Sequence, residues 1–184
     1  MRLIRPIPVT LSGIGAEREM ISTGYVQAMA EYNRWQNENL YGTADRLSEA
    51  VRKEPRGAFF GSIHATLNHL LWADQIWMSR LVGTPKPKAT GIPQSLGMYD
   101  SWDELKRERA AFDQLIVDWA ERLDPAWLGG DITWHSGSTG RVVTKPKWLI
   151  VTHIFNHQTH HRGQVHCMLT QAGGTPGMTD LAFR

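Results

Sequence analysis

Cysteine is nearly absent from this sequence. Among its 184 residues there is one, Cys167, so no disulfide can form within the chain. Disulfides persist in oxidising compartments, and a chain without a pair of cysteines is more typical of a reducing one. We therefore expect a cytoplasmic protein in which Cys167 is a small buried residue that faces away from any functional site.

Long hydrophobic runs and a strongly basic patch are absent as well. No apolar run approaches the roughly 20 residues that span a bilayer, and residues 1–16 are interrupted by prolines and lack the apolar core of a signal peptide. The formal net charge is only +2, and the Lys and Arg residues are scattered along the chain. These absences argue against membrane and nucleic-acid partners and leave a small-molecule substrate as the expected partner.

The length of the chain fits one domain with a sizeable core. We expect a single domain over residues 1–184, in which the Gly- and Pro-rich residues 1–16 form an extended leader. The eight tryptophans are many for this length, and the plainest interpretation is that they fill a small helical core.

Apolar residues at spacings of three and four predict long helices in four segments: residues 17–41, 62–82, 101–123 and 144–172. Ser62 and Ser101 are suitable N-caps, and Glu104 completes a capping box with Ser101. Thr144 is the expected N-cap of the last helix, which we expect to stop at Gly173.

Residues 129–144, GGDITWHSGSTGRVVT, contain two short β-prone runs on either side of a turn. The fold class that these patterns predict is all-α, a four-helix bundle with a small β-hairpin inserted before the last helix. The hairpin and the loop 83–100 are candidates for the lining of a substrate entrance. The connection lengths do not fix the order of the helices around the bundle.

Histidines recur at every fourth position near the C-terminus, at His153, His157 and His161. On a helix this spacing stacks the imidazoles on one face, and neutral imidazole is a common ligand of zinc, nickel, copper and iron. At about 100° per residue, His157 lies about 40° from His161, and His153 lies about 80° from it. Since His161 falls on the apolar stripe, His157 and His161 are the predicted inward pair. His153 is an extra ligand or a hydrogen-bond donor beside one.

A metal centre with an open position for water usually has three protein ligands, so a third must come from another element. His64 and His69 flank the apolar face of the second helix on opposite sides, and periodicity does not choose between them. His135 in the hairpin is a weaker candidate because of its loop setting. The competing interpretation is chance, because eight histidines in one chain produce such spacings by accident.

Two polar residues are candidates for the surroundings of the site. Asp74 falls in the middle of the apolar face of the second helix, where a carboxylate needs a partner. It either accepts a hydrogen bond from an imidazole ligand or forms a structural pair, for example with Arg162, and the structural pair is favoured. Gln164 follows the inward pair and borders the site or packs, while Gly163 is expected to permit close helix approach.

Three segments resemble the DinB family of metalloenzymes (the DinB/YfiT-like group). They are EYNRWQNENL, FFGSIHATLNHLLWADQIWMSRL and HIFNHQTHHRGQVHCMLTQAGGTPGMTDL, and the similarity spans about residues 22–181. The combination of NHLLWAD with NHQTHHRGQ is much more specific than a single HxxxH. The longer leader and the ending DLAFR depart from the family pattern without touching these histidines.

The resemblance implies a four-helix bundle, often a homodimer, in which three histidines hold one divalent metal, commonly nickel or zinc. One histidine comes from the second helix and two come from the fourth. Carried over by motif, they are His69 in NHLLWAD, His157 in FNHQ and His161 in HHRG. Some relatives use low-molecular-weight thiols such as glutathione, bacillithiol or mycothiol, so a thiol is a further expected cofactor.

These observations predict a metal-dependent enzyme, either a hydrolase or a thiol-dependent S-transferase, whose metal acts as a Lewis acid. No dedicated general base is identifiable, so catalytic residues other than the ligands stay unassigned. The alternative is a non-catalytic protein in which the metal is structural or reports stress. A closed fourth ligand, such as His153 or His135, favours that alternative, whereas an exchangeable position facing a cleft favours catalysis.

Overall fold

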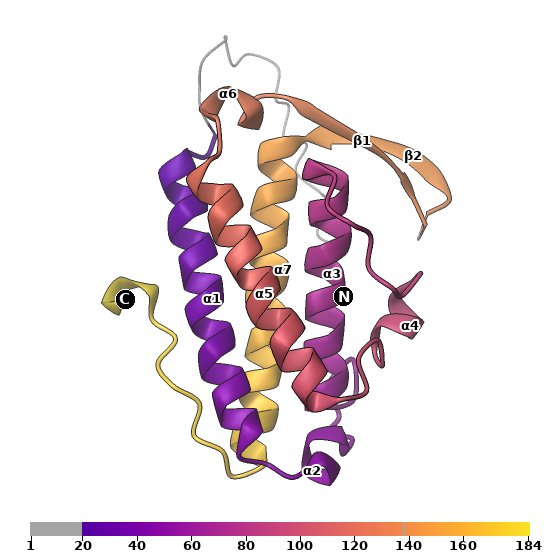
Figure 1. Ribbon diagram of the computed structural model, residues 1–184, viewed down its shortest axis with the longest axis vertical. Helices are drawn as coiled ribbons and strands as arrows, with labels where there is room; N and C mark the ends of the chain where they lie inside the picture. The colour runs from indigo at the N-terminus through magenta and orange to yellow at the C-terminus, as the bar shows by residue number, and fades with distance from the viewer. Residues whose placement is uncertain (1–19, 138) are drawn as a thin grey trace, which may run out of the picture.

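Four long helices dominate the protein (Figure 1). The computed structural model describes residues 20–137 and 139–184, so the expected leader at 1–16 lies outside the described residues. The long helices are α1 (Thr23–Asp45), α3 (Ile63–Val82), α5 (Trp102–Glu121) and α7 (Lys147–Gln171). The predicted helical bundle is confirmed, and no helix in the described part of the chain has both the length and the hydropathy needed to cross a membrane.

Short elements occupy the connections and the C-terminal tail. They are α2 (Glu49–Lys53), α4 (Ile92–Ser95), α6 (Pro125–Leu128), β1 (Asp131–Ser136), β2 (Arg141–Pro146) and the 3-10 helix η1 (Leu181–Phe183). The two strands pair antiparallel just before α7, as the sequence predicts. Ile132 and Ser136 are buried and Trp134 is half-buried, so one face of the hairpin rests on the protein. His135 lies on the opposite, exposed face.

The order of the helices leaves a long connection on the outside of the bundle. α1 and α7 run in one direction, and α3 and α5 run in the other (Figure 1). α3 packs against α5 and α7, and α1 packs against the same two helices. α3 and α5 are consecutive long helices that run in the same direction. The chain between them, residues 83–101, therefore returns along the bundle, and it includes the short helix α4 (Figure 1). We call these residues the returning segment.

Serine caps set the starts of three long helices. The side chains of Ser22, Ser62 and Ser101 accept hydrogen bonds from backbone N–H groups three residues later, as N-caps do. α3 ends at Gly83, whose φ of 76° is the left-handed conformation that glycine adopts without strain. These signals explain why α3 and α5 lie close to their predicted positions.

The start of α7 differs from the prediction. Thr144 is a residue of β2 and not an N-cap, and its Oγ1 lies 2.8 Å from Thr133 Oγ1 across the hairpin. The β-branched run at 142–144 favours the strand, and Pro146 ends it because proline has no backbone N–H to donate. α7 therefore begins at Lys147.

A charged core occupies the centre of the otherwise apolar bundle. All four long helices contribute buried residues to it: Asn33 and Asn37 from α1, Asp74 from α3, Arg109 and Asp113 from α5, and Gln158 and Arg162 from α7. Burying charged groups is costly unless they are paired. Arg109 pairs with both carboxylates, at 2.7 Å from each.

Hydrogen bonds in the charged core cross between helices. Asp74 accepts from Arg109 Nη1 at 2.7 Å and from Gln158 Nε2 at 3.0 Å. Arg162, the partner suggested from the sequence, donates to Asn33 of α1 instead. Asp74 is therefore in a structural pair, but its arginine comes from α5, which packs against α3, and not from α7.

Candidate metal centre

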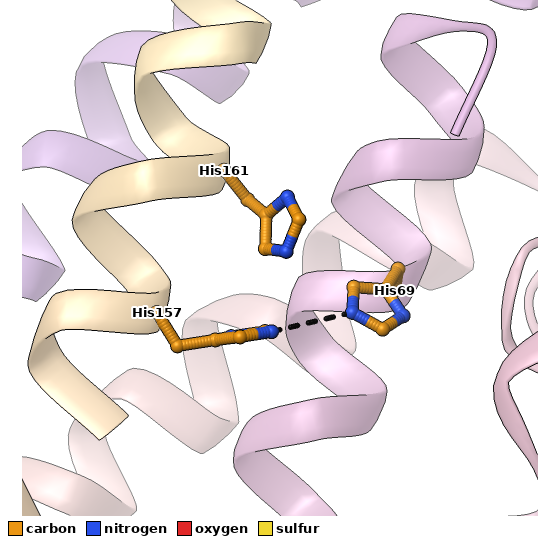
Figure 2. Close-up of side chains that lie close together, drawn as sticks. All are labelled: His69, His157 and His161. Carbon is orange, nitrogen blue, oxygen red and sulfur yellow. Dashed lines mark hydrogen bonds between the residues drawn. The ribbon is translucent and has the colours of Figure 1, made fainter. Parts of the chain in front are cut away.

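Three imidazoles meet between α3 and α7 (Figure 2). His69 projects from α3, and His157 and His161 project from successive turns of α7. One nitrogen of each ring lies within 4.8 Å of the others, and His69 Nε2 is 3.4 Å from His157 Nε2. Two nitrogens bound to one ion at about 2.1 Å with a tetrahedral angle are about 3.4 Å apart. The spacing therefore fits a single metal ion.

The tautomer of His69 is fixed from the far side of its ring. Its Nδ1 lies 3.1 Å from Ser95 Oγ, and the Ser95 hydroxyl donates its own hydrogen to Ile92 O at 2.7 Å. Ser95 must therefore accept at His69, so the imidazole proton is on Nδ1. The lone pair of Nε2 is left facing the other two rings, as in metal-ligating histidines.

His161 is oriented in the same way by Gln164. Its Nδ1 lies 2.8 Å from Gln164 Oε1, and an amide oxygen can only accept. The amide nitrogen of Gln164 points to His160 Nε2 at 3.4 Å, which agrees with that assignment. The proton of His161 is therefore on Nδ1, its Nε2 is free, and Gln164 borders the site.

Burial keeps the three imidazoles neutral. Assisted by the neighbouring imidazoles, it lowers the pKa of His69 to about 4 and the pKa of His157 to about 3. Burial also lowers the pKa of His161 below its usual value. A histidine must be deprotonated to bind a metal, so at neutral pH no proton competes at these rings.

Phe60 covers the histidines from the loop before α3. Its ring centroid lies 4.0 Å from that of His69 and 5.1 Å from that of His161. The loop turns at Gly57 and Gly61, whose φ values of 71° and 81° are in the left-handed region. The apolar ring restricts the orientation of both imidazoles and keeps water from that side.

A cavity of about 990 Å³ opens beside the histidines. Its walls come from α3, α7, the returning segment and the hairpin, so the loop and the hairpin line it as the sequence suggested. Most lining side chains are apolar or aromatic, among them Phe59, Trp72, Ile76, Trp77, Ile92 and Trp134. A cavity of this size and character is typical of a small-molecule site.

Two of the predicted neighbours of the site lie outside the three-histidine cluster. His153 is exposed and packs edge-on against Trp77, with ring centroids 5.3 Å apart. Asp74 follows His69 by five residues, which is about 140° around a helix. It therefore faces the charged core, while His69 faces the cavity.

The other residues singled out from the sequence have other surroundings. His64 is buried, and its Nε2 lies 2.9 Å from Tyr99 O, so it joins α3 to the returning segment. Cys167 is exposed, so the expectation of a buried thiol is wrong. Gly163 is also exposed, and no described atom beyond its chain neighbours and the local backbone of its own helix lies within 4 Å of where its Cβ would be. It therefore serves no close helix contact.

Sequence reasoning did not single out three residues of the site. Ser95 and Phe60 contact His69, and Arg80 lines the cavity. Arg80 carried a usable signal, because it follows His69 by eleven residues, three helical turns along one face. Phe60 comes from the loop before α3 and Ser95 from the short helix α4 within the returning segment, and no periodicity predicts the paths of these connections.

Comparisons with known proteins place the chain in a family. A sequence profile described as the DinB family matches residues 20–184. Protein DinB of Bacillus subtilis (strain 168) is 26% identical over 154 residues, which cover 83% of this chain and 89% of that protein. A crystal structure of a DinB-like protein from Bacillus cereus ATCC 10987 shares the fold, with a TM-score of 0.63 and 18% identity over 85% of this chain and 97% of the other. The chain belongs to the DinB family.

Proposed function

We propose that this protein is a metal-dependent enzyme of the DinB type, in which His69, His157 and His161 hold one divalent ion, nickel or zinc. The observation that carries the proposal is the convergence of three neutral imidazoles at the wall of a cavity. In two of them Nδ1 is hydrogen-bonded away from the centre, so Nε2 is free for a metal. Three ligands leave positions open for water or substrate, as in catalytic zinc sites.

The chain's own residues supply orientation and exclusion of water. Ser95 and Gln164 hold two of the rings with Nε2 toward the centre, and Phe60 covers them with an apolar ring. The bound ion supplies a Lewis acid that lowers the pKa of a water or thiol, or polarises a carbonyl. The aromatic cavity beside it is suited to the apolar part of a substrate.

A purely structural or sensing metal is the competing function, and it needs a fourth ligand that closes the centre. Within the described residues the cluster has three groups, and neither His153 nor His135 belongs to it. Both of these histidines are exposed. The arrangement therefore favours catalysis.

The direct test is metal content. Purified protein incubated with nickel or zinc and then desalted is expected to retain close to one equivalent, measured by inductively coupled plasma mass spectrometry. The double variant His157→Ala, His161→Ala is expected to retain almost none. The matched control is His135→Ala with His166→Ala, which removes two imidazoles outside the cluster and is expected to behave like wild type. Full retention in the first variant would refute the ligand assignment.

Within the enzyme class, we propose a thiol-dependent transfer as the first reaction to test and hydrolysis as the second. The volume of the cavity, about 990 Å³, is at the upper end of the range for small-molecule sites, which supports room for a thiol beside a second substrate. A thiol that binds the folded protein raises its Tm by mass action. If glutathione, bacillithiol and mycothiol all leave the Tm of the nickel-loaded protein unchanged, the proposal of a thiol-dependent transfer is contradicted.

We further propose that the protein is a cytoplasmic homodimer. Family membership supports the dimer, and the single cysteine supports a reducing compartment. Sedimentation equilibrium measures the dimer directly, and a monomer at micromolar concentration would contradict it.

A further inference from the structure

One wall of the cavity carries a guanidinium without an acidic partner. Arg80 lines the cavity, and no carboxylate among the residues that the structure describes does so. Within the described part of the chain, Arg80 forms no ion pair or hydrogen bond. It is half-buried, and burial lowers its pKa. Among the described residues that line the cavity, Arg80 is the one Lys, Arg, Asp or Glu side chain.

Two indoles hold this guanidinium in place. Arg80 Cζ lies 4.7 Å from the ring centroid of Trp77 and 5.8 Å from that of Trp134. The two indoles pack edge to face, with centroids 5.3 Å apart. Arginine on aromatic faces keeps its N–H groups available for hydrogen bonds. The side chain is therefore preorganised, with its donors unused.

The guanidinium and the histidines occupy opposite ends of one face of α3. His69 and Arg80 are eleven residues apart, which corresponds to about 16 Å along a helix. Trp72, Ile76 and Trp77 lie between them on the same face and also line the cavity. The cavity therefore has a metal-ligating end, an apolar middle and a cationic end.

We propose that this cavity binds an elongated apolar carboxylate, with its carboxylate on Arg80, its hydrocarbon or aromatic body along Trp72, Ile76 and Trp77, and its reacting end at the histidines. The position of the reacting end rests on the proposed function, whereas the contact with Arg80 does not. A guanidinium donates to a carboxylate through two parallel hydrogen bonds. One guanidinium in apolar surroundings suits a monoanion, because a phosphate dianion needs further donors. The positive charge of the guanidinium repels protonated amines.

The competing role for Arg80 is structural, in which it only joins α3 to the hairpin through Trp134. That role predicts a loss of stability on substitution and no change in the preference among ligands. A test must therefore compare ligands that differ in charge but not in shape. Octanoate, octanol and octylamine satisfy this condition.

The experiment measures binding of these three probes to the full chain by isothermal titration calorimetry, with the fluorescence of the pocket tryptophans as a second readout. It uses wild type, Arg80→Gln and the control Arg107→Gln, which removes the same charge from an exposed position on α5. Wild type is expected to bind octanoate more tightly than octanol and octylamine. Arg80→Gln is expected to lose about tenfold or more in affinity for octanoate, as for a charge-assisted hydrogen bond, and to keep its affinity for octanol. Arg107→Gln is expected to match wild type.

Chain length gives a further readout, because each methylene buried along the apolar middle adds roughly threefold to fourfold in affinity. Affinity is therefore expected to rise from butanoate to octanoate. The inference is overturned if Arg80→Gln binds octanoate as wild type does, if octylamine binds as well as octanoate, or if no carboxylate of the series binds.

All titrations are done on both chelator-treated and nickel-loaded protein, so that this inference and the proposed function fail separately. Dependence on Arg80 is expected in both states. If octanoate binds only the nickel-loaded protein and ignores Arg80, its carboxylate is on the metal, and the inference fails while the metal centre stands. If nickel does not bind at all but Arg80 still selects octanoate, the metal centre fails and the carboxylate site stands.

Discussion

The charged core and the three-histidine centre use adjacent positions of α7, yet the polar groups of the two regions have different kinds of partner. Gln158 and Arg162 directly follow His157 and His161, and one residue turns a side chain about 100° around a helix. In the core, each carboxylate is bonded to the guanidinium of Arg109 and to amide donors from another helix. In the centre, one ring nitrogen of each histidine faces the other two, and none of the three is paired with a charged side chain of the described residues. Polar groups with internal partners fix how the helices pack, whereas polar groups left with free lone pairs serve a ligand.

Breaking the charged core is expected to have the largest effect. Arg109→Leu leaves Asp74 and Asp113 buried without their shared guanidinium. Removing one partner of a buried ion pair lowers the free energy of unfolding by about 3–5 kcal/mol, measurable by urea denaturation. Arg107→Leu, at an exposed position of the same helix, is the control and is expected to change it by less than about 0.5 kcal/mol. A loss below about 1 kcal/mol in Arg109→Leu would show that the core pairing is unimportant for stability.

Acid is expected to act on the two regions with opposite signs. In the metal-free protein, His69 and His157 have pKa values of about 4 and about 3. Below about pH 6.5 the unfolded state takes up protons there that the folded state does not, so stability falls as the pH falls. Burial raises the pKa of Asp113 to about 6. Asp113 therefore adds stability as the pH falls from about 6 to about 4.

The variant His157→Gln separates these contributions. Asp113 is present in both proteins, so its effect cancels in the difference between their free energies of unfolding. That difference is expected to move in favour of the variant by at most about 1.4 kcal/mol per pH unit between pH 6.5 and pH 4.5. Urea denaturation in chelator at several pH values measures it. A difference that stays constant over this range would mean that His157 is not held neutral by burial.

A smaller effect is expected when the support of a ligand is removed and the ligand itself is kept. Ser95→Ala removes the acceptor for His69 Nδ1–H, and losing such a partner weakens metal binding by about 10–100-fold. Competition with a fluorescent zinc chelator measures the affinity. Ser79→Ala is the matched control, because Ser79 also bonds to a backbone carbonyl three residues earlier but touches no histidine. Equal affinities in the two variants would contradict the role of Ser95.

The smallest effect is expected at a position that belongs to neither region. Gly163 is exposed within α7 and has open space where a Cβ would lie. Gly163→Ala is expected to raise the free energy of unfolding by at most about 1 kcal/mol, because alanine favours the helix. Metal affinity is expected to stay the same. A destabilised variant would indicate that a second copy of the chain covers this surface.

Local signals explain which parts of the fold could be predicted. The helices that became α3 and α5 were predicted well because a serine cap marks the start of each. The first helix, predicted over 17–41, is α1 at Thr23–Asp45. The prediction starts this helix too early because it does not identify Ser22 as the N-cap. The start of α7 was missed because residues 142–144 satisfy a strand as well as a helix start, and pairing with β1 decides between them.

The site shows the same division between local and tertiary information. The inward pair on α7 followed from helical geometry, and the structure brings His157 and His161 together with His69. The choice of His69 over His64 came from the family resemblance. Both residues flank the same face of α3, and only the way α3 packs against α7 decides which of them faces the α7 histidines. Ser95 and Phe60 could not be predicted, because their positions depend on the paths of two connections, the returning segment that carries α4 and the loop before α3.

The returning segment connects two parallel helices, and it also places Ser95 against His69 and Ile92 in the wall of the cavity. Lengthening or shortening such a connector costs the folded state little, since closure entropy grows slowly with loop length. The same change in length is expected to move the hydrogen-bond partner of His69 and one wall of the cavity. Insertions and deletions in the returning segment can thus change the surroundings of the histidines during evolution, while the four long helices keep their arrangement.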